Sequence, residues 1–539
     1  MPTITLNKKV LEGLIGKKLS LETLKDRISY LGTDLESIEG NDITVEIFPN
    51  RPDMLSEQGF ARALASFIGV KTGLREYKVS KSSYQVIVEH SVQKIRPYTA
   101  CAVVKNLHFN DEKIREVIQI QEKLHVTYGR NRKKAAIGIY PFEKIKTPIH
   151  YKALPKEKIR FKPLESSREM TALQILRDHP AGRDYGYLLD GLSLFPIFAD
   201  ADNRILSMPP IINSHDTGKI TEKTKDVFVE CSGFDFETLK TLLNIIVTMF
   251  ADMGGDIYAM ELFYGKKKIM TPDLKPSTIG LDIKYVNKLL GLKLLHIELK
   301  KFLGRMGFGY TLGKVLVPSY RADILHPIDL VEDIAIAYGY EHFESPIPKV
   351  STVAEENVLE PFKRKIQELL IGLGLLELSS FTLIPREILT KCSMDEKAIE
   401  LKNPLSKEFN VVRPSLIPSM LQILAENQHH EYPQRLFEIG TVVDEEEKIH
   451  LAIVVSHEKA GFTELKQILD ALLFSLRLEY VVEPQKLDSF IEGRSGDIIS
   501  NKRFLGTIGE INPKVLGNFN LGNPVAALEI DLSSLYEKQ

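Results

Sequence analysis

The chain lacks tryptophan and is poor in cysteine, and neither sign of charge dominates it. Its 539 residues contain no Trp and only Cys101, Cys231 and Cys392. Three scattered cysteines form neither a disulfide framework nor a paired zinc motif. Lys and Arg total 70 against 72 Asp and Glu, a formal net charge of −2, so the composition carries no overall signature of nucleic-acid binding. Any RNA contact must be local or supplied by a partner.

Long apolar runs are also missing. No stretch has the length of a membrane-spanning helix, and the strand-like segment 3–6 follows the first residues without a signal peptide, so we expect a cytoplasmic protein. What the chain does contain, 43% hydrophobic and 26% charged residues, suits several globular cores. Its length predicts three to five domains.

The most informative segment is an acidic helix predicted to begin at Pro327. Asp329, Glu332 and Asp333 fall at i, i+3 and i+4 and therefore share one helix face, and Asp323 on the preceding loop could close over them. Hard carboxylate oxygens suit Mg²⁺, which takes only part of its coordination shell from protein. The alternative is that the acids only favour the positive end of the helix dipole.

An internal repeat provides a control for this choice. Residues 6–32 align without a gap with residues 281–307, a step of 275. After a shorter loop, residues 51–69 align with residues 321–339, a step of 270. One fold is therefore predicted to occur twice.

The first copy of the repeat lacks the acidic cluster. Gly59, Arg62 and Ala63 replace the three acids of the helix, so we predict that the helix forms and packs without them and that the acids are functional. Asp323 is weaker evidence because its counterpart Asp53 is acidic where no cluster exists, and such a residue can simply cap a turn.

Turn residues and the repeat divide the chain into four blocks, 1–82, 83–265, 266–346 and 347–539. The second block mixes alternating strands with one long amphipathic helix that ends near Gly254, which predicts an α+β architecture.

A polar run, residues 209–222, lies between apolar strands of the second block. Two prolines stiffen its entry and a glycine lets the backbone turn, so Asn213, His215, Asp216 and Thr217 could line a pocket. The alternative is a plain capped turn, since Asn, Ser, Asp and Gly are turn residues. We interpret the neighbouring segment 225–231 as an ordinary buried strand.

Motifs in both repeat copies resemble a known family. Asn-Arg-Pro-Asp at 50–53, Tyr-Arg-Ala-Asp at 320–323 and the acidic helix after it are similar to the β subunit of phenylalanyl-tRNA synthetase, archaeal and eukaryotic type, and the resemblance extends over the whole chain. It implies a Mg²⁺ shared with the α subunit and bound by the residues matching Asp323, Asp329, Glu332 and Asp333.

The resemblance also implies that residues 83–265 form the family's proofreading domain, which hydrolyses tyrosine wrongly esterified to tRNA. Its loop usually reads Pro-Pro-Ile-Ile-Asn, a small residue and an acid. Here His215 stands at the acidic place and Asp216 follows it, which leaves the acidic position open. A pocket built for phenylalanine cannot strongly reject an added hydroxyl, so a second pocket must detect it with polar groups that stay unpaired when phenylalanine enters. Because no Ser-His-Asp order or metal signature is visible there, we expect a bound water oriented by polar side chains and the tRNA.

The last block resembles the family's catalytic-like class II module. An active class II site needs an arginine in a Gly-rich third motif to hold ATP phosphates. The corresponding segment 506–513 has glycines and an acid but no arginine. We therefore expect no aminoacylation by this chain, and structural or interface roles for Arg413 and Arg435.

The predicted fold is thus multidomain α+β. Two copies of a small helical α/β module, 1–82 and the Mg-binding 266–346, flank an α+β editing domain, and a class II synthetase-like antiparallel-sheet module without active-site motifs follows. As a β subunit the chain would support ATP-dependent charging of tRNA(Phe) by the α subunit in an α2β2 complex, and would hydrolyse Tyr-tRNA(Phe). Two alternatives stay open: a free-standing trans-editing deacylase, which obligate association argues against, and a non-catalytic tRNA-binding scaffold.

Overall fold

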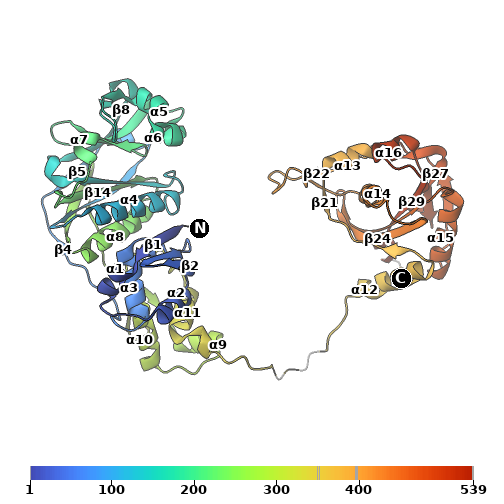
Figure 1. Ribbon diagram of the computed structural model, residues 1–539, viewed down its shortest axis with the longest axis horizontal. Helices are drawn as coiled ribbons and strands as arrows, with labels where there is room; N and C mark the ends of the chain where they lie inside the picture. The colour runs from blue at the N-terminus through green and yellow to red at the C-terminus, as the bar shows by residue number, and fades with distance from the viewer. Residues whose placement is uncertain (1, 349, 351–352, 395–397, 537–539) are drawn as a thin grey trace. The chain divides into compact units, whose positions relative to one another are not determined.

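The computed structural model describes residues 2–348, 350, 353–394 and 398–536 (Figure 1). The chain forms two compact units, residues 1–346 and 347–539. Within the described residues, no helix combines the length and the apolar character needed to cross a membrane.

The first unit contains the repeated module twice. Module 1 consists of β1 (Thr3–Asn7), α1 (Lys8–Ile15), α2 (Leu21–Tyr30), β2 (Asp34–Glu39), β3 (Asp42–Glu46) and α3 (Glu57–Phe67). Module 2 consists of β17 (Ser277–Gly280), α9 (Ile283–Leu290), α10 (His296–Arg305), β18 (Gly309–Thr311), β19 (Lys314–Val317) and α11 (Pro327–Tyr338). The sheets have equivalent orders, β1-β3-β2 and β17-β19-β18, which confirms the predicted duplication.

Equivalent capping residues begin and end the first helix in both modules. The Asn7 side chain caps α1 and the Asp282 side chain caps α9 by accepting backbone N–H bonds. Gly16 and Gly291 end these helices with φ of 82° and 67°, a left-handed conformation that glycine adopts without strain. All four positions are repeat counterparts, so the copies keep the signals that start and stop the helix.

The two modules pack on each other with approximate two-fold symmetry. A Cβ on Gly32 would lie 3.8 Å from the Ile336 side chain, and a Cβ on Gly307 would lie 3.9 Å from the Ser66 hydroxyl. Gly32 and Gly307 are counterparts, as are Ser66 and Ile336. The contact therefore occurs twice in opposite directions, as in an isologous dimer interface.

The editing domain predicted between the modules contains an eleven-stranded mixed sheet. Nine strands follow the order β13-β12-β11-β8-β5-β15-β6-β14-β7, and two others pair with β15. The strands are β4 (Val79–Ser80), β5 (Gln85–Val88), β6 (Tyr98–Lys105), β7 (Ala135–Pro141), β8 (Ile149–Pro155), β11 (Leu194–Ala199), β12 (Ile205–Met208), β13 (Ile212–Asn213), β14 (Val227–Gly233), β15 (Asp256–Tyr264) and β16 (Lys267–Thr271).

The structure has two long helices here where one was predicted: α4 (Asp111–Val126) and α8 (Phe236–Asp252) both lie between this sheet and module 1 (Figure 1). Val227, Val229 and Cys231 of β14 share a core with the apolar side of α8. Because side chains alternate along a strand, the intervening residues of β14 point to the opposite face. There Phe228 packs with Tyr140 and Phe198, and the shorter helices α5 (Ala172–Asp178) and α6 (Pro180–Tyr185) belong to the same domain.

The second unit is built on a seven-stranded sheet, antiparallel except for one pair, in the order β20-β24-β25-β29-β28-β27-β26. Its strands are β20 (Leu376–Glu377), β24 (Gln434–Val443), β25 (Glu447–Ser456), β26 (Val481–Pro484), β27 (Phe490–Ser500), β28 (Arg503–Ile511) and β29 (Val525–Asp531). The cores on its two faces include α12 (Leu359–Gly372) and α15 (Phe462–Ser475) on one side, and α14 (Ile417–Glu426) and α16 (Pro513–Asn518) on the other. The predicted antiparallel-sheet module is confirmed.

Arg413 of this unit is buried. It donates to Glu438 at 2.8 Å and to the Thr441 carbonyl at 2.8 Å. A Cβ on Gly440 would lie 2.4 Å from the guanidinium, which explains the glycine beside it. These contacts give Arg413 a structural role.

Candidate functional site

A cavity of about 630 Å³ opens in the domain between the modules. Its walls come from α4, from the start of β7, from α6 and from the segment that follows β12. Polar residues in the lining include Glu122, His125, Arg132, Asn213, His215 and Glu230. Apolar side chains such as Ile137, Ile139 and Ile211 make up much of the rest. An apolar hollow with a few convergent polar groups is the usual form of a small-ligand site.

Glu230 forms the polar centre of this cavity. Its side chain is 2% exposed, and the Tyr140 hydroxyl donates towards Glu230 Oε1 at 3.1 Å while lying 3.3 Å from Asn213 Oδ1. Oε2 of the same carboxyl is buried without a hydrogen-bond partner in the described part of the chain. Burial raises the pKa of Glu230 to about 8, so the carboxyl is mainly neutral at pH 7.

The buried strand predicted for segment 225–231 is confirmed, but the prediction did not anticipate that Glu230 within it lines the cavity. The signal was available in the sequence, because an acid stands within an otherwise apolar strand. Strand alternation separates it from its helix-covered neighbours and turns it towards the cavity. Burying a carboxyl without full hydrogen bonding is costly, and such groups are frequent at functional sites. The cavity beside Glu230 is therefore a candidate site.

The structure divides the four residues predicted from the loop. Asn213 and His215 line the cavity, and His215 Nδ1 is buried with no partner in the described residues. Asp216 is exposed and Thr217 is buried with its hydroxyl 3.5 Å from the Ile205 carbonyl, and both lie outside the cavity lining. The single helical turn α7 (His215–Gly218) produces this division, because successive residues of a helix point in different directions.

Arg132 supports the same loop, and the sequence did not predict this role. It donates to the Ile211 carbonyl at 2.8 Å and to both oxygens of Glu122 at 2.9 and 3.1 Å, and its guanidinium lies 4.1 Å from the centre of the Tyr185 ring. Arg130, Asn131 and Arg132 all have positive φ, between 50° and 64°. This left-handed turn places the Arg132 side chain against the loop, α4 and α6, which form three walls of the cavity. No residue pattern in the sequence predicts the turn.

The four predicted metal ligands of module 2 have separate partners. Arg321 donates to both oxygens of Asp323, at 2.8 and 2.7 Å, and to Asp333 at 2.7 Å. The Oδ2 atom of Asp329 accepts the backbone N–H groups of residues 325 and 326, and Glu332 is exposed.

Module 1 repeats the first of these pairs. Arg51 donates to both oxygens of Asp53 at 2.9 Å, so the Arg–Asp pair belongs to the shared fold. Among the described residues, no group of three or more His, Cys, Asp and Glu side chains is placed to hold a metal ion. The arrangement does not fit a preformed four-carboxylate Mg²⁺ site within this chain alone.

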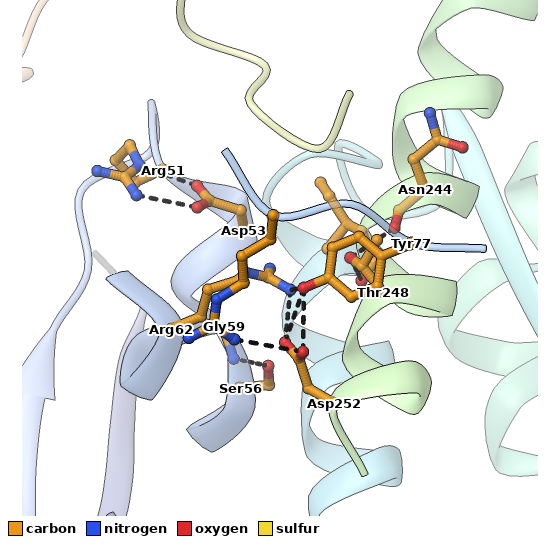
Figure 2. Close-up of polar contacts among 11 residues, drawn as sticks. Arg51, Asp53, Ser56, Gly59, Arg62, Tyr77, Asn244, Thr248 and Asp252 are labelled. Carbon is orange, nitrogen blue, oxygen red and sulfur yellow. Dashed lines mark hydrogen bonds and ion pairs between the residues drawn. The ribbon is translucent and has the colours of Figure 1, made fainter. Parts of the chain in front are cut away.

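Arg62, the counterpart of Glu332, has a different role in module 1. Figure 2 shows Arg62 and Tyr77 converging on Asp252 at the end of α8, with Arg62 donating to Asp252 at 2.7 Å and to the Tyr77 hydroxyl at 2.9 Å. The guanidinium also lies 4.0 Å from the centre of the Tyr320 ring of module 2. The face of α3 that carries Arg62 is thus buried in a joint between both modules and the cavity domain.

The domains occur in the order expected of a multidomain aminoacyl-tRNA synthetase subunit, with a cavity-bearing domain between two small modules and a class II-like sheet after them. Residues 279–340 match the family model described as the tRNA synthetase B5 domain. Residues 344–532 match the one described as the phenylalanyl tRNA synthetase beta chain CLM domain.

Relatives extend the match over the whole chain. Phenylalanine-tRNA ligase beta subunits are 37% identical in Thermococcus sibiricus and 38% in Archaeoglobus fulgidus, each covering 100% of this chain and 99% of the relative. The crystal structure of an N-terminal fragment of the phenylalanyl-tRNA synthetase β subunit from Pyrococcus horikoshii matches with a TM-score of 0.61 at 38% identity, over 63% of this chain and 100% of the fragment. The chain belongs to the phenylalanine-tRNA ligase β-subunit family.

Proposed function

We propose that this chain, as a phenylalanine-tRNA ligase β subunit, hydrolyses Tyr-tRNA(Phe) in the cavity around Glu230. The observation that carries the proposal is the buried chain Glu230–Tyr140–Asn213, which ends in an unpartnered carboxyl oxygen buried in the wall of an apolar hollow. A hydroxyl entering the hollow would satisfy that oxygen. Phenylalanine would leave it unpaired, at a cost of roughly 1–3 kcal/mol for each unsatisfied buried group.

This arrangement reverses the preference of the pocket that selects phenylalanine for attachment to tRNA. An apolar site tuned to phenylalanine discriminates weakly against tyrosine, whereas a site that hydrogen-bonds the hydroxyl rejects an analogue without it. The neutral Glu230 carboxyl can donate to the tyrosine oxygen, and Tyr140 fixes the orientation of that carboxyl. Proofreading therefore needs only a few polar atoms in an otherwise apolar cavity.

Hydrolysis at this site would use water. Asn213 and the free Nδ1 of His215 are the polar groups of the loop that face the cavity and could orient a water towards the ester. Asp216 and Thr217 would contribute by fixing the conformation of the loop. Arg132 holds that loop against α4 and α6.

The test compares Tyr-tRNA(Phe) hydrolysis by the purified α–β complex carrying Glu230→Leu or Glu230→Gln. We expect the leucine variant to lose hydrolysis of Tyr-tRNA(Phe) while the charging of phenylalanine continues, and the neutral glutamine to retain part of it. Unchanged deacylation by Glu230→Leu would remove the cavity from the mechanism.

We also propose that module 2 binds the α subunit through α11. The equivalent face of module 1 docks on the cavity domain through Gln58 and Arg62, whereas Ile328 and Glu332 at the same positions of module 2 are exposed. Asp329 and Glu332 are the acids left open to a partner, so a Mg²⁺ shared between the subunits would be held by these two together with ligands from the α subunit.

The assembly that we propose is an α2β2 complex acting on tRNA(Phe) in the cytoplasm, with ATP as a substrate of the α subunit. A free-standing deacylase and a non-catalytic scaffold make different predictions. The first would hydrolyse Tyr-tRNA(Phe) without a partner, and the second would bind tRNA without hydrolysing it. Light scattering of the isolated chain, together with its deacylation assay, separates the three.

A further inference from the structure

We propose that Phe234 is a stacking platform for an unpaired nucleotide of the tRNA 3′ end, where the strand leaves the cavity. This inference rests on the proposed proofreading function. It adds a nucleotide-binding site outside the cavity that holds the amino acid. The evidence is the position of Phe234, the buried charge beneath it and the groups around it.

Phe234 stands just beyond the end of β14, the strand that carries Glu230. At about 3.3 Å per residue, the four-residue separation places it roughly 13 Å from Glu230 along the strand. Ser232 lies between them on the same face, where its hydroxyl accepts from Arg96 at 3.2 Å. A tRNA strand whose terminal tyrosine reaches Glu230 with its hydroxyl, and which leaves the cavity along β14, would pass Phe234 with its next nucleotides.

Arg96 places a cation below the ring, and it forms no ion pair with the described residues. Its guanidinium lies 5.4 Å from the centre of the Phe234 ring and is 3% exposed. It donates to the hydroxyl and the carbonyl of Ser232 and to the carbonyl of Arg132, which are all neutral acceptors. The ring, 53% exposed, thus presents one face to solvent above a buried cation.

Other aromatic and basic groups lie at the same end of the sheet. Tyr98 pairs with Gly233 across the sheet and its ring centre lies 6.2 Å from that of Phe236 and 6.4 Å from that of Tyr264. We call these four rings, Tyr98, Phe234, Phe236 and Tyr264, the aromatic ledge. The exposed Lys133 precedes β7 at this end of the sheet, and the exposed lysines 266–268 follow Tyr264.

This chemistry favours single-stranded nucleic acid over a protein partner. Bases stack on exposed aromatic faces without sequence preference, while cationic groups attract the phosphates between them. A protein hot spot would instead need a surrounding apolar surface that excludes water. Here exposed lysines lie at the same end of the sheet, and the Arg132 carbonyl, which accepts from Arg96, belongs to a residue of the cavity wall.

The experiment uses the α–β complex and tRNA(Phe) with 2-aminopurine, a fluorescent base, at the nucleotide next to the 3′-terminal adenosine. We expect binding to quench its fluorescence through stacking. Phe234→Ala should abolish the quench and raise the Kd by about 5- to 150-fold, the range for loss of one base–aromatic stack. Phe234→Tyr should keep both signals. The control is Phe504→Ala, since Phe504 is 59% exposed on the second unit and plays no part in the ledge.

The result that overturns the proposal is an unchanged quench and Kd in Phe234→Ala. Loss of α-subunit binding in that variant, with tRNA affinity intact, would also overturn it by making the ledge a protein interface. The assay is independent of ester hydrolysis. If Glu230→Leu leaves deacylation unchanged while Phe234→Ala loses the quench, the proofreading mechanism fails and the nucleotide platform stands.

Discussion

Leu55 and Leu325 occupy the same position in the two modules, yet Leu55 is 2% exposed and Leu325 is 85% exposed. Each precedes the helix that carries the distinguishing residues, Arg62 on α3 and Glu332 on α11. In module 1 this helix docks on the cavity domain, whose α4 and α8 contribute Glu116 and Asp252. In module 2 the same face meets no other part of the described chain through such contacts.

The first prediction follows from this asymmetry. Leu325→Asp should weaken binding of the α subunit by about 10- to 150-fold, because burying a charge at a hydrophobic contact costs roughly as much as losing a hot-spot residue. Analytical ultracentrifugation of the α–β complex measures the change.

A matched control exists on the same module. Leu312 is also highly exposed, but on the hairpin between β18 and β19, away from α11. Leu312→Asp should leave assembly unchanged. Equal effects of the two substitutions would argue against α11 as the docking face.

The second prediction separates the acids of α11. Asp333→Ala removes one of the two carboxylates that bind the buried Arg321, so it should lower the free energy of unfolding by about 1–3 kcal/mol. Exposed Glu332 should tolerate Ala within about 0.5 kcal/mol. Urea unfolding of both variants measures the difference.

Metal dependence gives the complementary readout. A Mg²⁺ that bridges two subunits stabilises the complex, so the midpoint of α–β dissociation should rise with Mg²⁺ and fall with EDTA. Glu332→Ala should lose this response without losing stability. If neither Mg²⁺ nor EDTA changes the midpoint of α–β dissociation, the exposed acids of α11 only interact favourably with the helix dipole near its start.

Much of the fold was predictable because local signals are repeated. The helix at 327–338, its glycine cap and the two copies of the module all follow from spacing and turn residues. The expectation that all three helix acids are dispensable for packing does not extend to Asp333. Arg321 binds Asp333 although twelve positions separate them in the sequence. In the described part of the chain, the counterpart Arg51 donates to a single carboxylate, that of Asp53.

The residues of the cavity were only partly predictable, because some of them depend on tertiary contacts. Asn213 and His215 lie on a polar loop that sequence can recognise. Glu230 and Arg132 acquire their roles from tertiary contacts, one from strand pairing and the other from a left-handed turn.

The third prediction concerns the pH dependence of proofreading. Because burial raises the pKa of Glu230 to about 8, the carboxyl should donate to the tyrosine hydroxyl below that pH and lose the proton above it. The rate of Tyr-tRNA(Phe) hydrolysis, corrected for the uncatalysed reaction, should fall as the pH rises through 8. Glu230→Gln should show no such fall, since its amide does not titrate. A fall that persists in the glutamine variant would assign the titration to another group.

The last prediction concerns Glu116, at the joint between module 1 and the cavity domain. The backbone N–H of Glu57 donates to one of its oxygens at 2.9 Å and the Gln58 amide donates to the other at 3.1 Å. Burial, aided by the nearby Glu57 carboxylate, nevertheless raises the pKa of Glu116 to about 7. The folded state thus holds a proton that the unfolded chain releases near pH 4.5.

Stability should therefore fall as the pH rises from about 4.5 to about 7 and should change little from this group above that, because the folded protein binds more protons than the unfolded chain only within this window. Each pKa unit corresponds to about 1.4 kcal/mol, so the loss amounts to at most about 3.5 kcal/mol. Glu116→Gln removes the titration. The difference in unfolding free energy between the variant and the native protein, measured in urea at pH 5 and pH 8, should move in favour of the variant at pH 8. A constant difference across this range would show that Glu116 titrates normally and that the joint leaves its carboxylate well solvated.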